Sequence, residues 1–152
     1  MPWTIFPYWL IDIFYGLSLL IHRSRATLDA HAKRLLFAQI VSVIGFLAFP
    51  LHFSFQRPET SGLSGWLFEV LLGFDKPFNQ APSLHISLLV ILWTLYARFL
   101  SGLWLWLFRI IAVLIGISVL TTYQHHFIDI PTGALVGCVA VMLFPLKPQT
   151  AI

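Results

Sequence analysis

Cysteine and charge are both scarce in this sequence. Cys138 is its only cysteine, which excludes a scaffold held together by internal disulfides. Charged residues make up 10% of the 152 residues, against about 25% in an ordinary soluble domain. The nine Lys and Arg residues are scattered between hydrophobic runs, so despite a pI near 9.4 they form no basic face for nucleic acid.

Apolar residues dominate the composition. They account for 59% of the chain, and its 14 Phe, 6 Trp and 4 Tyr are too many rings to leave in water, which excludes a disordered protein. The mean hydropathy of +0.86 is typical of membrane proteins. The length predicts a single domain over residues 1–152.

Five hydrophobic runs approach the roughly 20 apolar residues that a helix needs to cross a hydrocarbon core about 30 Å thick. A shorter apolar piece, residues 66–74, lies in the long 56–82 connection and predicts an interfacial helix. The sequence therefore predicts an all-α, polytopic transmembrane bundle of about five spanning helices plus this short one. The five runs are residues 3–21, 35–55, 83–100, 104–122 and 131–146.

Basic residues are unevenly distributed between the two sides of this bundle. If the runs cross alternately, one side carries seven cations and the other only Arg57 and Lys76. Cytoplasmic loops are enriched in Lys and Arg, so we expect the 56–82 and 123–130 connections to face outward. This predicts an integral protein of the inner (plasma) membrane, with His22 and His31 solvated on the cytoplasmic side. The seven cations are Arg23, Arg25, Lys33, Arg34, Arg98, Arg109 and Lys147.

Polar residue types that act on phosphate are predicted to meet at the outer surface. Ionisable groups there are functional candidates, because a charge that faces lipid is costly. His125 and Asp129 are the most informative pair, since a carboxylate four residues away on a helix can hold one imidazole nitrogen and leave the other nucleophilic. The whole group comprises Arg57, Ser83, His85, His125, His126 and Asp129.

Each of these residues also has a structural alternative. An interfacial His pair can cap a helix end or reach toward water, and Pro131 disfavours helix in the residue before it. Ser83, which follows Pro82, is a natural N-cap, although a helix N-terminus also offers N–H groups to an anion. Arg57 is either a phosphate ligand or an interface anchor.

Three short motifs follow one another along the chain: Arg57-Pro58, Pro82-Ser83-Leu84-His85 and His125-x-x-x-Asp129. In order and spacing they resemble the motifs of the type 2 phosphatidic acid phosphatase superfamily, also called lipid phosphate phosphatases. The Pro-Ser-Leu-His form and the double His are similar to its inositol phosphorylceramide synthase branch. The resemblance runs from the second predicted helix to the fifth.

This resemblance implies a phosphatase or phospho-headgroup transferase that needs no metal and no cofactor. His125 would attack phosphorus to form a phosphohistidine, and Asp129 would orient it. His85 would be the general acid, while Arg57 and Ser83 would hold the phosphate oxygens. The partner would be a membrane lipid: phosphatidic acid, a polyprenyl diphosphate or a phospholipid headgroup donor.

The chain departs from the family pattern at two cations, because Pro50 and Val119 stand where the family has Lys and Arg. Fewer cations favour a phosphodiester, whose charge is lower than that of a monoester. One span fewer than is usual in the family also predicts a homo-oligomer or a partner helix. The alternative function is a catalytically degenerate relative that binds lipid or assists assembly. Lys76 is a candidate to replace one lost cation, and neutral hydrogen bonds from Thr121, Thr122 and Gln124 are the alternative. His126 is a further accessory candidate.

Overall fold

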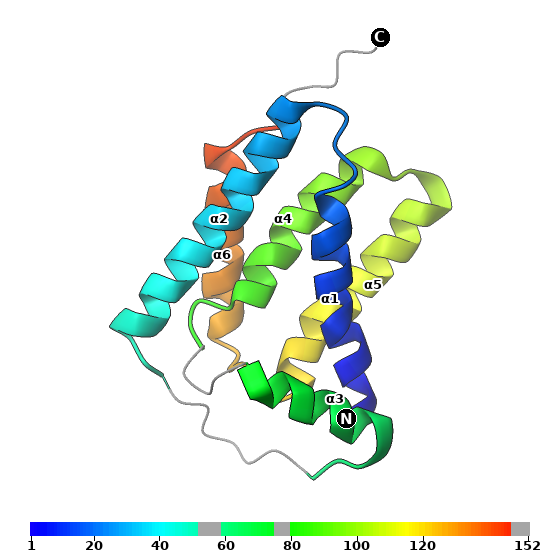
Figure 1. The fold of residues 1–152 in the computed structure, drawn as a ribbon, viewed down its shortest axis with the longest axis vertical. Coiled ribbons are helices and arrows are strands. Elements are labelled where there is room, and N and C mark those ends of the chain that lie inside the picture. The colour runs from blue at the N-terminus through cyan, green and yellow to red at the C-terminus, as the bar shows by residue number, and fades with distance from the viewer. Residues whose placement is uncertain (52–58, 75–79, 147–152) are drawn as a thin grey trace.

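A computed structural model of the chain describes residues 1–51, 59–74 and 80–146, apart from the side chain of Phe74. Over these ranges the chain forms six α-helices and no strand, which confirms the predicted all-α class (Figure 1). A short 3-10 turn, Pro2–Thr4, precedes them. The helices are α1 (Ile5–Ser18), α2 (Arg25–Ala48), α3 (Gly62–Phe74), α4 (Leu84–Phe99), α5 (Gly102–Thr121) and α6 (Asp129–Leu143).

Two of these helices, α2 and α5, are long and apolar enough to cross a membrane. Helices α4 and α6 are shorter apolar helices, and α1 has 14 residues. Helix α3 covers the piece that the sequence predicts as a short interfacial helix. The helical class is therefore established, while the five membrane spans stay a prediction.

The sequence prediction places α2 too late in the chain. The polar residues 22–34, between the first two hydrophobic runs, are predicted to form a loop. The helix instead begins at Arg25, because Ser24 caps it. Ser24 Oγ accepts the Thr27 N–H at 3.3 Å. The earlier start turns His31 into the bundle. His31 is fully buried and its Nε2 lies 2.9 Å from Ser18 Oγ, so the prediction of a solvated His31 is wrong.

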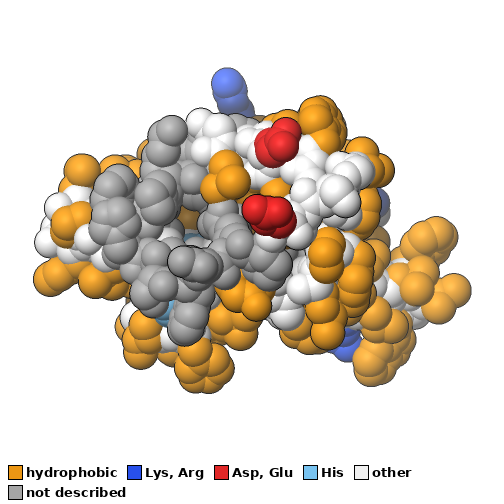
Figure 2. Space-filling view, turned by 90° about the horizontal axis from the view of Figure 1, so that it is seen from below, with side chains coloured by type: hydrophobic (Ala, Val, Ile, Leu, Met, Phe, Trp, Pro, Cys, Tyr) orange, Lys and Arg blue, Asp and Glu red, His pale blue; other side chains and the backbone are white. Residues whose placement is uncertain are grey.

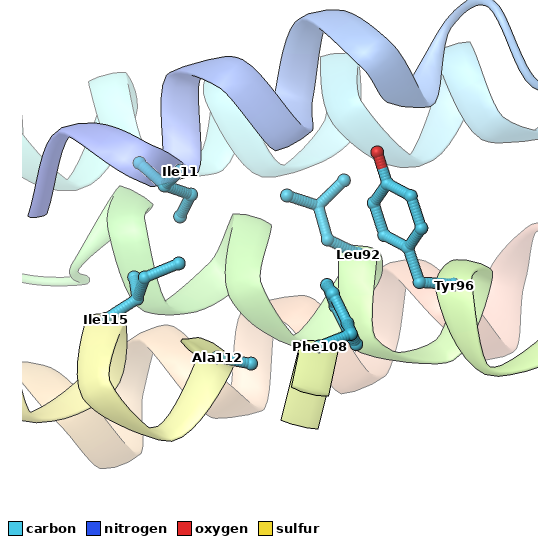
Figure 3. Close-up of a cluster of buried hydrophobic side chains, with 6 residues drawn as sticks. All are labelled: Ile11, Leu92, Tyr96, Phe108, Ala112 and Ile115. Carbon is cyan, nitrogen blue, oxygen red and sulfur yellow. The ribbon is translucent and has the colours of Figure 1, made fainter. Parts of the chain in front are cut away.

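Helix α4 is the centre of the bundle, because it packs against α1, α2, α5 and α6 (Figure 1). Helix α3 lies across one end, beside α1 and the N-terminal turn. Figure 3 shows the main hydrophobic cluster, which joins α1, α4 and α5. The phenol of Tyr96 stays satisfied there by donating to the Phe14 carbonyl at 2.9 Å. The cluster consists of Ile11, Leu92, Tyr96, Phe108, Ala112 and Ile115.

The close contact between α4 and α6 depends on two glycines. A Cβ added to Gly133 would meet the backbone carbonyl of Ser83, and one added to Gly137 would meet the carbonyl of Ser87. Backbones this close exchange hydrogen bonds: the Ser87 hydroxyl donates to the Gly133 carbonyl at 2.9 Å, and the Ser83 N–H donates to the Asp129 carbonyl at 3.2 Å. This register holds the start of α4 beside the start of α6.

We expect Gly133→Ala to destabilise the bundle by about 1–3 kcal/mol, since the added methyl meets backbone and cannot be accommodated by a side-chain shift. Gly16→Ala is the matched control, because a Cβ on Gly16 in α1 meets nothing within 4 Å. Alanine favours a helix over glycine by up to about 1 kcal/mol, so the control should be neutral or stabilising. Thermal unfolding followed by circular dichroism in one detergent measures both. Equal melting temperatures for the two variants would contradict the packing argument.

Candidate active site

The sequence-predicted residues Ser83, His85, His125, His126 and Asp129 lie at one end of the bundle, where α4 begins, α5 ends and α6 begins. Figure 2 views this end, which lies at the bottom of Figure 1. Ser83, His125 and Asp129 are all buried here, with 0%, 6% and 0% of their surfaces exposed. Buried polar groups are costly unless they are paired, so their hydrogen bonds decide what this end can do.

His125 is held through one ring nitrogen. Its Nδ1 lies 3.0 Å from the Gln80 carbonyl oxygen and 3.3 Å from Asp129 Oδ2. Both partners are acceptors, so Nδ1 must carry the hydrogen and donate to them. In the neutral ring the lone pair then lies on Nε2, which is the nitrogen available to attack an electrophile.

Asp129 is fixed in turn by the chain around it. Its Oδ2 accepts the backbone N–H of His126 at 2.8 Å, and it is the first residue of α6, where the positive end of the helix dipole favours a carboxylate. The contact between His125 and Asp129 was expected to need a helix. The structure makes it with a turn instead, since residues 125–128 precede α6 and the Asp129 N–H donates to the His126 carbonyl at 3.0 Å.

His85 lies in the first turn of α4, next to His125. Its ring stacks on Tyr8 of α1, with centroids 4.1 Å apart and planes inclined by 23°. The two imidazoles are close enough for a charge on His125 to act on His85. Nε2 of His85 is buried and has no hydrogen-bond partner among the described residues. A buried nitrogen without a partner is uncommon in a folded protein.

Ser83 caps α4, as its place after Pro82 predicts. Its Oγ accepts the Ile86 N–H at 3.4 Å, and its carbonyl accepts the Ser87 N–H at 3.0 Å. The hydroxyl hydrogen of Ser83 is not used by the cap, so the residue can still donate to an anion at the helix N-terminus.

Tyr8 and Gln80 were missed by the sequence analysis. Gln80 contributes a backbone carbonyl, which every residue has, so no residue type could mark it. Tyr8 is 1% exposed and comes from α1, far from the motifs in sequence. The only feature of the sequence that marks Tyr8 is its aromatic ring, and aromatic residues are common in the first hydrophobic run.

Other predicted site residues are placed as follows. Arg57 and Lys76 lie outside the described residues. Gln124 is buried beside His125, and His126 is half-buried. Val119, which stands where the family has Arg, is fully buried among apolar side chains, so no cation is available at that position.

The threonines proposed as neutral phosphate donors have other partners. The Thr122 hydroxyl donates to the Ser118 carbonyl at 2.7 Å, and the Thr121 hydroxyl lies within 3.3 Å of the Ile117 carbonyl. Both hydroxyls therefore bind carbonyls in the last turn of α5. This does not support the prediction that they donate to phosphate in place of the lost cations.

His125 lines one cavity, and a second cavity lies beside that one. A cavity of about 540 Å³ is lined by His125, His126 and Phe127. A second cavity of about 190 Å³ contains Glu59 and Glu69 and shares Met1, Thr121 and Tyr123 with the first. Acidic side chains are visible on this end of the molecule in Figure 2. In the described ranges, no three His, Cys, Asp or Glu side chains are arranged to hold a metal ion.

Comparison with known proteins identifies the family. The family model described as the PAP2 superfamily matches residues 31–152, and the chain belongs to that superfamily. Its members are phosphoesterases. The match does not separate the branches of the superfamily, so the similarity to the inositol phosphorylceramide synthase branch stays a prediction. No curated protein and no solved structure matches the chain.

The tautomer of His125 is a direct prediction of this geometry. In protein labelled with ¹⁵N-histidine, neutral His125 should give the nitrogen shifts of the Nδ1–H form, because Nδ1 faces two acceptors. The signal is assigned by its loss in His125→Gln. Asp129→Ala removes one acceptor and should shift the population toward a mixture of tautomers. A predominant Nε2–H form in the unsubstituted protein would contradict the assignment of Nε2 as the nucleophile.

Proposed function

We propose that this protein is a membrane-embedded lipid phosphatase or phosphotransferase that works through a phosphohistidine on His125. The observation that carries the proposal is the pairing of His125 Nδ1 with Asp129 and the Gln80 carbonyl, which leaves Nε2 as the nucleophilic nitrogen. Membership of a phosphoesterase superfamily supports the same chemistry.

In the first step, the Nε2 lone pair attacks phosphorus and a P–N bond forms while the P–O bond to the leaving group breaks. His85, in its protonated form, gives its proton to the departing oxygen. The carboxylate of Asp129 stabilises the charge that develops on the His125 ring. Ser83 and the N–H groups at the start of α4 face the non-bridging oxygens, with Arg57 as the proposed cationic ligand.

In the second step, water or the hydroxyl of a second lipid attacks the phosphohistidine. His85, now neutral, takes the proton from the attacking oxygen, the P–N bond breaks and the electron pair returns to Nε2 of His125. Both residues are then in their starting states. Hydrolysis and transfer differ only in which hydroxyl enters the cavity.

The surface of the bundle supports the proposed bilayer position. Large apolar side chains are exposed along its helices, among them Leu20, Leu47, Leu103 and Met142, each at least 70% exposed. Such continuous apolar exposure is rare in soluble monomers. Figure 2 shows hydrophobic side chains around the outer edge of this end of the bundle. The uneven distribution of Lys and Arg favours an active site on the non-cytoplasmic face.

The electrostatics of the site favour a phosphodiester substrate. Val119 replaces one family cation with a buried apolar side chain, and Glu59 and Glu69 line a second cavity that shares Thr121 and Tyr123 with the cavity lined by His125. A doubly charged monoester is repelled more strongly by these carboxylates than a singly charged diester. We therefore propose that the protein transfers a phospho-headgroup between lipids.

The decisive assay measures turnover by purified protein in detergent, in the presence of EDTA, with phosphatidic acid and a labelled phospholipid diester as parallel substrates. We expect His125→Ala to lower turnover by about 10³-fold or more, since the nucleophile is lost. His22→Ala is the matched control, because it removes a histidine at the opposite end of the bundle and should retain activity.

The outcomes separate the alternatives. Loss of activity in EDTA would contradict the metal-independent mechanism. Faster turnover of phosphatidic acid than of any diester would contradict headgroup transfer and leave a phosphatase. If no substrate is turned over, the chain is better described as a catalytically degenerate relative that binds lipid or assists assembly.

A further inference from the structure

Helix α5 carries one cation in its first half, away from the candidate active site (Figure 1). This residue, Arg109, lies seven positions after Gly102, where α5 begins, and twelve before Thr121, where α5 ends. At about 1.5 Å per residue, it is about 10 Å from the start of the helix and about 18 Å from the end that leads to His125. Arg109 therefore has no part in the proposed reaction.

Two indole rings hold the guanidinium of Arg109. Its Cζ lies 5.8 Å from the ring centroid of Trp93 on α4 and 5.5 Å from that of Trp106 on α5. Trp106 is about one turn nearer the start of α5, so the Arg109 side chain extends toward that end of the bundle. Both distances allow cation–π attraction, which places the guanidinium but makes no use of its hydrogen-bonding capacity.

That hydrogen-bonding capacity is not satisfied by the described part of the chain. Nε of Arg109 is buried and has no hydrogen-bond partner there. Among the described side chains Arg109 also forms no ion pair, since the pair found there joins His125 and Asp129. A buried donor without an acceptor costs free energy, so the guanidinium is suited to an anion that comes from outside the bundle.

An apolar groove adjoins this guanidinium between α4 and α5. It is a cavity of about 270 Å³, and Trp93 belongs both to its lining and to the surroundings of Arg109. Gly116 keeps it open, because a Cβ at that position would meet only Leu89 Cδ2, at 3.4 Å. The Thr94 hydroxyl at its edge donates to the Ile91 carbonyl at 2.8 Å and offers no free donor. The lining includes Leu89, Val90, Trp93, Ala112, Val113 and Gly116.

We propose that Arg109 binds the phosphate of an anionic membrane lipid, with an acyl chain of the same lipid in the groove between α4 and α5. A guanidinium matches the oxygens of a phosphate, and an apolar groove matches a hydrocarbon chain. Charge and groove also follow one another in the right order, since Ala112, Val113 and Gly116 lie deeper along α5 than Arg109. The inference rests on the proposed bilayer position and is independent of the reaction at His125.

The depth of Arg109 suits the headgroup of such a lipid. Helix α5 is long and apolar enough to cross a membrane, so in the proposed bilayer position it starts at one membrane surface. A side chain that extends back toward this surface brings its guanidinium close to the headgroups. Trp104 and Trp106, which are 69% and 62% exposed, suit the same level, where Trp is enriched. In the orientation proposed above, this is the cytoplasmic leaflet, whose surface is negative.

The test uses the fluorescence of Trp93, because this ring lies beside both Arg109 and the groove. The protein is reconstituted in vesicles of phosphatidylcholine and phosphatidylglycerol, with bromine on the acyl chains of one of the two lipids at a time. Bromine quenches an indole that it touches, and the difference from Trp93→Phe isolates the Trp93 signal. We expect phosphatidylglycerol to quench Trp93 with an apparent affinity about fivefold higher than that of phosphatidylcholine, the factor expected for one cation near an anionic lipid.

Three variants assign the site. Arg109→Gln should abolish the preference for phosphatidylglycerol, because the phosphate loses its cation. Gly116→Leu fills the groove, should lower the quenching of Trp93 by both lipids, and keeps the test decisive if Arg109→Gln does not fold. Arg25→Gln is the matched control, since it removes an exposed cation at the same end of the bundle and should retain the preference.

Several outcomes overturn the proposal. Equal quenching of Trp93 by the two lipids does so, as does a preference that Arg25→Gln loses to the same extent as Arg109→Gln. A third is quenching that spares Trp93 but reaches Trp104, isolated in the same way with Trp104→Phe, since protein such as a second copy of the chain would then cover the groove. If no tryptophan is quenched, the proposed bilayer position fails as well, whereas turnover at His125 is measured separately.

Discussion

The close approach of α4 and α6 is the constraint on which the candidate active site depends. Gly133 and Gly137 let the two backbones come near enough for the Ser83 N–H to reach the Asp129 carbonyl. That contact places the N-terminus of α4 beside the turn that carries His125, so that the Gln80 carbonyl and Asp129 meet the same ring nitrogen. A wider spacing between the helices would separate His85, the proposed general acid on α4, from His125, the proposed nucleophile before α6.

Local chemistry was the part of the structure that the sequence could predict. Ser83 after Pro82 predicts a helix start, and His125 with Asp129 predicts a contact that the structure contains, although a turn rather than a helix makes it. Features set by packing between distant segments could not be predicted in this way. The stacking of Tyr8 on His85 and the burial of His31 both depend on which helix lies beside which. The early start of α2 was missed because polar residues between hydrophobic runs resemble a loop, whereas the cap at Ser24 makes them helical.

The two ends of the bundle differ in the charge of the side chains that they carry. Around His125, a buried carboxylate orients the imidazole and two glutamates line the adjoining cavity, so the site is less positive than the family pattern implies. At the other end, Arg34 and Arg98 donate to the Phe144 and Leu146 carbonyls that follow α6. An uneven charge of this kind orients a membrane protein, since positive residues are retained on the cytoplasmic side.

The central claim is that His125 becomes covalently attached to phosphorus, and trapping that intermediate tests it most directly. The protein is incubated with a lipid phosphate ester labelled at phosphorus, quenched in alkali, digested and examined by mass spectrometry. The account predicts a label that is stable to alkali and labile to acid, located on His125 and absent from His125→Ala. A label on His126 or another residue, or turnover that persists in His125→Ala, would contradict it.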